Sequence, residues 1–279
     1  MPTTPHIAIS GFGAVSPAGW TAADLNTTSP VDTTTIEIPG AAPALVRRVP
    51  KPPAPLPFAR HPRRRRVSPN GRFATAAAIE AVGSGRDTSR LGVICTVMNA
   101  CVNYSHRFFR EVLEDPSTAS PILFPETVFN APSSHLSAYF GSTAPNNTIV
   151  HDSSGFIAGL DLAAAWLTDR QLDACLVVCA EETDPLSAQA LSYFDRHAIP
   201  AEGAAAILLE ATATPPAIEL TSISTTASAS PLATPPIIGN TLGALAGLET
   251  IHALQSGRTT VHVPTLPDHV STVTFKTNP

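Results

Sequence analysis

The segment His151-Asp152-Ser153-Ser154-Gly155 carries the residue types best suited to chemistry, because it separates a strand pattern at 148–150 from a helix pattern at 156–168. Side chains at such a junction meet the free N–H groups of the first helical turn. Ser153 with His151 as its base is one candidate nucleophile, but residues two apart at a helix start do not face one another. We therefore expect Ser153 to cap the helix, and the Asp152 carboxylate to accept hydrogen bonds from its N–H groups.

The other reactive residue types predict neither a metal site nor a cofactor. The four cysteines contain no Cys-x-x-Cys pair and no Cys/His cluster with zinc spacing. Cys175 and Cys179 lie four apart in an apolar run, so on a strand both thiols face one core layer. His106, His135 and His151 are expected to be hydrogen-bonded structural histidines. The glycines after residue 10 are not a dinucleotide fingerprint, because Ser16 stands where the third glycine is required.

The elements that position these residues alternate between strands and helices. Strand patterns cover 6–10, 91–97, 148–150, 172–180, 204–209 and 218–224, and helix patterns cover 73–82, 103–114, 156–168 and 241–254. This alternation of buried elements predicts an α/β layered fold. Gly11, Gly13 and Gly19 predict a sharp turn after the first strand. The Ser, Thr, Ala and Pro bias of 221–236 predicts a loop or a joint between two halves. We divide the chain into 1–214 and 215–279.

Composition predicts a globular protein whose surface is partly covered by another chain. Of the 279 residues, 43% are apolar and only 14% are charged, against roughly 25% charged in an average soluble domain. No apolar stretch reaches the ~20 residues that a bilayer requires, and no secretory leader opens the sequence. We expect a cytoplasmic protein without membrane contact.

Positive charge is concentrated in one Pro-rich stretch. Nine basic residues and no acidic residue lie between Arg47 and Arg72, which leaves 8 basic against 22 acidic residues elsewhere. The stretch reads as a solvated loop or as a patch for an acidic protein. Nucleic acid is not expected, because no reading motif or aromatic platform accompanies the arginines.

Five segments, taken in order, resemble the β-ketoacyl-acyl-carrier-protein synthases, the condensing enzymes of the thiolase fold. They are Ile7 to Gly19, Ser120 to Asn130, Ala144-Pro145-Asn146 with Ser153-Ser154-Gly155, Glu202 to Glu210, and Gly239 to Gly247. The resemblance implies a thiolase-like α/β/α/β/α fold. It also implies a shortened C-terminal half, because fewer than thirty residues separate Glu210 from Gly239, where full-length members carry a long insertion.

The differences from the family bear most directly on function. Asp152 stands where a working synthase has its nucleophilic cysteine, and Asn240 replaces one of the two active-site histidines. The His-Gly-Thr-Gly-Thr segment that holds the other histidine is missing. Because it lacks these catalytic residues, the chain resembles the chain length factor, the inactive partner of an active synthase in type II polyketide systems. The shortened half is most similar to factors of the polyene-making, highly reducing branch.

This resemblance implies three surfaces. The acyl tunnel would be lined by Met98, Cys101, Val102, Tyr104, Phe108, Phe109, Leu123 and Phe124. The dimer strand would be Asn147, Thr148, Ile149, Val150 and His151, and Arg60, Arg63, Arg64, Arg65 and Arg66 would contact an acyl carrier protein. The partner would be a full-length ketosynthase, in a heterodimer or an α2β2 form.

Two alternatives stay open. Tyr104, Phe108 and Val112 recur at helical spacing and could form an ordinary core stripe. The chain could also be a stand-alone acyltransferase or decarboxylase that uses Asp152 and Asn240.

Overall fold

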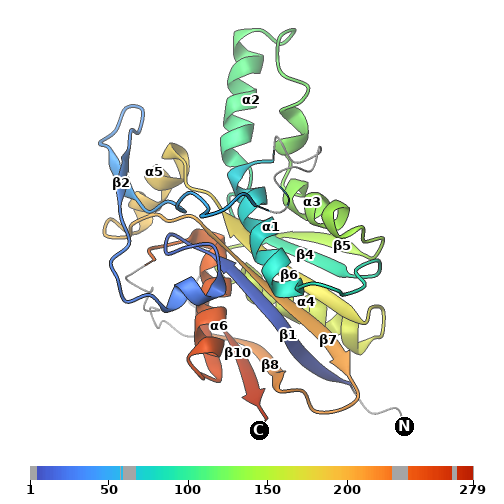
Figure 1. Cartoon of the computed structure of the whole chain (residues 1–279). Helices are drawn as coiled ribbons and strands as arrows, with labels where there is room; N and C mark the ends of the chain where they lie inside the picture. The colour runs from blue at the N-terminus through green and yellow to red at the C-terminus, as the bar shows by residue number, and fades with distance from the viewer. Residues whose placement is uncertain (1–4, 57, 59–66, 228–237, 266–268, 279) are drawn as a thin grey trace.

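The computed structural model describes residues 5–56, 58, 67–227, 238–265 and 269–278. Eight strands form one mixed sheet in the order β5-β4-β6-β7-β1-β8-β10-β9 (Figure 1). These strands are β1 (His6–Val15), β4 (Gly92–Val97), β5 (Asn146–Val150), β6 (Ala174–Glu181), β7 (Gly203–Thr212), β8 (Ile218–Ala227), β9 (Thr260–Thr265) and β10 (His269–Thr277). A separate hairpin pairs β2 (Thr34–Ile36) with β3 (Ala44–Val46). The α/β fold class expected from the sequence is confirmed.

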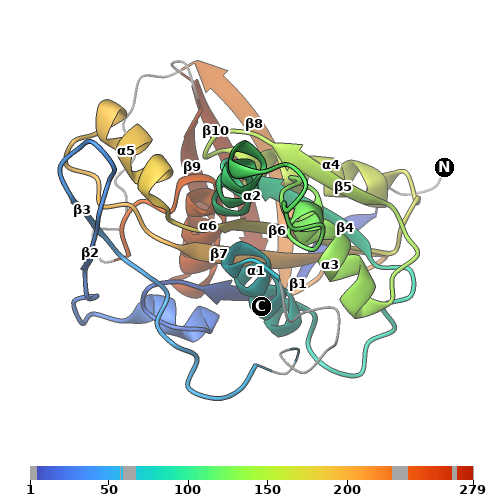
Figure 2. The ribbon, with the colours of Figure 1, turned by 90° about the horizontal axis from the view of Figure 1, so that it is seen from above.

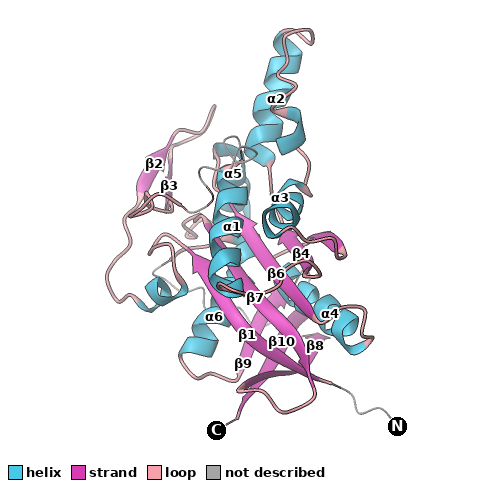
Figure 3. Ribbon diagram, turned by 45° about the vertical axis from the view of Figure 1, so that its right-hand side comes forward, coloured by secondary structure: helices cyan, strands magenta, loops and turns pink. Residues whose placement is uncertain are grey.

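Helices cover both faces of the strands β5 to β1 (Figure 2). On one face lie α1 (Pro69–Val82) and α3 (Ala131–Phe140), whose apolar side chains pack on β4, β6 and β7. On the other face lie α4 (Gly155–Thr168) and α6 (Leu245–Gln255). The sheet curves so that β8, β10 and β9 cover the far side of these two helices (Figure 3). The described residues therefore form the layers α/β/α/β.

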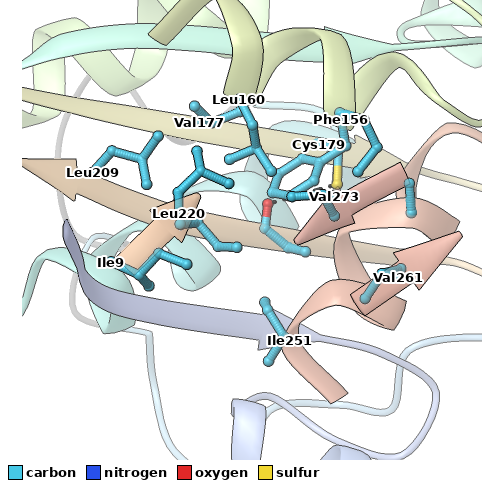
Figure 4. Packing of buried hydrophobic residues seen from close by; sticks show 14 of the residues in the cluster. Ile9, Phe156, Leu160, Val177, Cys179, Leu209, Leu220, Ile251, Val261 and Val273 are labelled. Atoms are coloured by element: carbon cyan, nitrogen blue, oxygen red, sulfur yellow. Dashed lines mark hydrogen bonds between the residues drawn. The ribbon is translucent and has the colours of Figure 1, made fainter. Parts of the chain in front are cut away.

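The largest core lies between the two parts of the sheet. Phe156 and Leu160 of α4 and Ile251 of α6 are buried there between strand residues such as Val177 and Val273 (Figure 4). The opposite face of β8, β10 and β9 carries polar side chains. By strand register this face presents Ser222, Ser224, Thr272, Thr274 and His262. Such a face can stay in contact with water.

The glycines of the first strand have a different role from the predicted one. β1 runs on through Gly11 and Gly13 with a bulge near Ser10, and the chain turns only at 16–19. A Cβ atom at Gly11 would lie 2.0 Å from the Ala81 carbonyl oxygen, and one at Gly13 would lie 2.2 Å from that of Ala77. Glycine is required because α1 approaches β1 so closely. The prediction of a turn was wrong for Gly11 and Gly13, whereas Gly19 lies in the turn at 16–19.

Several elements differ from the sequence reading or were not predicted. β8 extends to Ala227, three residues beyond the predicted strand 218–224, so the first part of 221–236 is strand rather than a loop or joint. The helix expected from residue 241 begins as a 3-10 turn, η4 (Leu242–Ala244). The elements without a prediction are α3, α5 (Pro185–Phe194), β2, β3, β9, β10 and the 3-10 turns η1 (Ala22–Asn26) and η3 (Phe124–Glu126).

Candidate functional site

The candidate site lies where the parallel strands β5, β4 and β6 end. Their carboxyl ends lead into the junction 151–154, the turn 98–101 and the acidic run 181–184. The segment 239–244 packs against two of these. A Cβ atom at Gly243 would lie 2.7 Å from Glu181 Oε1 and 3.0 Å from Met98 Cβ. Carboxyl ends of neighbouring parallel strands are a common location for binding sites.

Asp152 closes the turn before α4 instead of presenting a free reactive group. Its Oδ1 accepts hydrogen bonds from the Ser154 N–H at 2.9 Å and from the Ser154 hydroxyl at 2.7 Å. The same oxygen lies 2.9 Å from His151 Nδ1. The expectation that the carboxylate accepts from N–H groups at the helix start agrees with this geometry. Asp152 has no sulfur with which to form a thioester.

Ser153 does not cap α4, so this prediction from the sequence was wrong. Its hydroxyl donates to the Pro264 carbonyl of β9 at 3.0 Å, so it connects the helix start to a strand distant in sequence. Ser154, not Ser153, is the serine near His151, at 3.4 Å from Nδ1. The pair Ser153 and His151 is therefore not arranged as a nucleophile and its base.

Asn240 is held in the backbone of its own loop. Its Oδ1 accepts the Leu242 N–H at 2.9 Å, while its main chain pairs with residues 199 and 201. Leu242 has a positive φ of 51°. The amide thus supports a strained turn of the chain, and it cannot take or give a proton as a histidine does.

Two carboxylates at the end of β6 were not singled out from the sequence. Glu181 and Glu182 are fully buried. Burial raises the pKa of Glu181 to about 8 and that of Glu182 to about 7, although backbone N–H groups partly oppose the shift. The sequence did contain a signal for this site, namely two consecutive acidic residues directly after a continuous apolar strand pattern. Acidic residues next to a buried strand need specific partners, so they mark a candidate site.

A helical hairpin of residues 102–130, here called the α2 arm, projects from the body beside this site (Figure 1). It contains α2 (Val102–Glu114) and η3. Its two legs are joined by the rings of Phe108 and Phe124, 5.5 Å apart, and by a 3.0 Å hydrogen bond from Ser105 to the Thr127 carbonyl. None of the residues of α2 is buried.

The predicted tunnel residues lie on this arm or just before it, and they divide into three groups by exposure. Phe109 and Phe124 are more than half exposed, Met98 is also exposed, and Val102, Tyr104 and Phe108 are partly buried. Cys101 and Leu123 are buried within this chain. Further exposed apolar side chains extend the surface, namely Leu113, Ile122, Val128 and Phe129. The partly buried positions of α2 do not belong to an ordinary core stripe.

Four of the five predicted dimer-strand residues lie in β5, at one edge of the sheet, and His151 directly follows its last residue. Val150 is 54% exposed, Asn147 and His151 are exposed, and Thr148 and Ile149 are partly buried. The Thr148 hydroxyl lies 2.8 Å from the hydroxyl of Ser133 in α3, and this contact connects the strand to the helix. An apolar residue on an edge strand favours pairing with another chain.

The remaining predictions concern charge and metals. Arg60 and Arg63 to Arg66 lie outside the described residues, whereas Arg48 of the same stretch pairs with the buried Glu202. His135 contacts Glu126 at 2.8 Å.

In the described part of the chain, no three His, Cys, Asp or Glu side chains are grouped as a metal site requires. None of the helices described there is long and apolar enough to cross a membrane.

Comparison with known proteins defines the family. Residues 41–268 match the model of the beta-ketoacyl synthase N-terminal domain. Because this match covers most of the sequence, the chain belongs to the beta-ketoacyl synthase family, as its resemblance implied. No curated protein matches the sequence.

Several solved structures share the fold at low sequence identity. The ishigamide ketosynthase/chain length factor has a TM-score of 0.83 at 15% identity, over 98% of this chain and 100% of that chain. A beta-ketoacyl synthase from Burkholderia phymatum has a TM-score of 0.75 at 13% identity, over 99% and 100%. The ketosynthase ApeO in complex with its chain length factor ApeC, from Xenorhabdus doucetiae, has a TM-score of 0.65 at 16% identity, over 96% and 99%.

Proposed function

We propose that this protein is a noncatalytic chain length factor that pairs with a full-length ketosynthase and shapes its acyl tunnel. The observation that carries the proposal is Asp152, an aspartate engaged in its own turn where the family places a nucleophilic thiol. Asn240, which stands at a histidine position of the family, adds to it.

The exposed apolar surface supports the need for a partner. Phe109 and Leu113 of the α2 arm are 59% and 69% exposed, and Val150 lies on the β5 edge. Large contiguous apolar patches on a soluble chain mark contact sites. The proposal is that β5 pairs with the partner's strand and that Met98, Tyr104, Phe108, Phe109 and Phe124 close the far end of the tunnel.

Three finer statements belong to the same proposal. The product would be a polyene, since the segment between Glu210 and Gly239 is short compared with that of full-length members. The acidic acyl carrier protein would be attracted by Arg60 and Arg63 to Arg66. The division into 1–214 and 215–279 would separate a ketosynthase-like part from a shortened second part.

Co-expression with a full-length synthase that has an intact Cys-His-His set tests the function. A stable complex is expected, in which only the synthase carries an acyl group. A soluble homodimer that by itself transfers acyl groups, or decarboxylates the malonyl group on a carrier protein, would instead establish the stand-alone activity at Asp152.

A further inference from the structure

We propose that Glu181 and Glu182 form a polar socket that sets the angle at which the α2 arm leaves the body, and so positions the apolar surface that limits chain length. The socket rests on the proposed function for its effect on products, but not for its effect on the arm itself. Both residues act as positioning residues, since neither is at the exposed surface.

Glu181 holds the turn from which α2 starts. Its carboxylate accepts the backbone N–H groups of Met98 and Asn99, the latter at 3.1 and 3.2 Å to its two oxygens. The next N–H, that of Ala100, also contributes. Ala100 has a positive φ of 47°, which is uncommon for a residue with a side chain. One buried carboxylate therefore holds the backbone of a strained turn.

Glu182 holds the first turn of α2 and ties it to α1. It accepts the Asn70 N–H of α1 at 3.4 Å and a hydrogen bond from the side chain of Asn103. Asn70 closes the connection, because its side-chain amide donates to the carbonyls of Ala180 and Ala100 at 2.8 and 3.4 Å.

Two other described contacts join the base of the arm to the body. One is a small apolar cluster in which Cys101 and Ala131 meet Cys95, Val97 and Ala100. The other is the 2.8 Å contact of Glu126, in the returning leg, with His135 of α3, so the socket holds the leg from which α2 starts. The thirteen residues of α2 make a lever about 20 Å long. A change of a few degrees at the socket would move the tip by about 1–2 Å, on the order of a carbon–carbon bond length.

Hydrogen exchange on the full chain tests the socket without any partner. In Glu181→Gln, an amide nitrogen replaces one acceptor oxygen, so we expect the amides of 98–103 to exchange at least tenfold faster. The control is Glu249→Gln, a partly buried carboxylate of α6 paired with Arg258, which should leave these amides unchanged. Equal exchange of 98–103 in the two variants overturns the socket. If Glu181→Gln does not fold, Glu181→Asp, which keeps the carboxyl group but shortens its reach, is compared in the same way.

The effect on products is measured separately, in the complex with a ketosynthase. Glu181→Gln and Glu182→Gln should shift the distribution of product lengths, while Glu249→Gln should not. Faster exchange with unchanged products would overturn the link to chain length and leave the socket in place. Failure to obtain any complex would count against the proposed function, whereas the exchange result would still stand.

Discussion

The Asp152 carboxylate and the Ser154 backbone N–H form a 2.9 Å hydrogen bond that closes the turn before α4. In this bond an N–H group at the start of the helix donates to a side chain of the same turn. The same groups would lower the pKa of a cysteine at this position in an active synthase. Under the proposed function, this junction keeps a closed turn at the helix start and carries no nucleophile.

The first prediction concerns the stability supplied by this turn. Asp152→Ala removes the acceptor and should lower the free energy of unfolding by about 1 kcal/mol, as for the loss of a helix cap. Asp152→Asn keeps the Oδ1 acceptor and should cost less. Thermal unfolding of the full chain measures both. Equal loss in the two variants would show that the hydrogen bond does not stabilise the turn.

The second prediction concerns pH. Burial raises the pKa of Glu181 to about 8 and of Glu182 to about 7 in the folded chain, from an ordinary value of 4.5. Groups with raised pKa values bind their protons more tightly when folded, so their contribution to stability is complete below about pH 4.5. It is lost as the pH rises through 7 and 8.

Unfolding measured between pH 5 and 9 checks this prediction. The wild-type chain should lose stability over this range, and Glu182→Gln should lose less, because its amide does not ionise. Glu114→Gln, a change at an exposed position, should follow the wild-type curve. A Glu182→Gln curve parallel to the wild type would contradict the assignment.

The structure also shows which parts of this account could be predicted from the sequence. The long apolar elements were found because their period is a local property, as for the pattern at 156–168 that became α4. α3 and α5 were missed because each is only ten residues long and mixes polar and apolar residues around its circumference.

The partners of buried polar groups could not be predicted in the same way. Glu181 meets Met98 and Asn99 across more than eighty residues of chain, and Ser153 meets Pro264 across 111. Such pairs depend on strand order, which no local pattern contains. The role of Gly11 was also non-local, since it depends on the approach of α1.

The third prediction concerns the tunnel wall. Phe108 is partly buried against Phe124, so Phe108→Ala should yield longer polyketides from a complex with a near-native melting temperature. Phe156→Ala, in the core, is the matched control and should lose roughly 3–5 kcal/mol of stability. If Phe108→Ala instead unfolds like Phe156→Ala and gives no longer product, the ring is a structural residue.

The fourth prediction concerns the edge strand. The His151 N–H donates to the Val97 carbonyl of β4 at 3.0 Å. Since N–H directions alternate along a strand, those of Thr148 and Val150 point to the open edge. Val150→Pro removes one outward donor and should abolish co-purification with the ketosynthase. Val150→Thr keeps the N–H and should retain the complex. Pairing through β5 is wrong if both variants bind equally well.

The most direct test of the central claim is intact-mass spectrometry of the co-purified complex after incubation with acyl-loaded carrier protein. We expect an acyl adduct on the ketosynthase and none on this chain, because Asp152 cannot form a thioester. Asp152→Cys should also create no condensing activity, since Asn240 cannot replace a histidine. A stoichiometric acyl adduct on the wild-type chain would contradict the account.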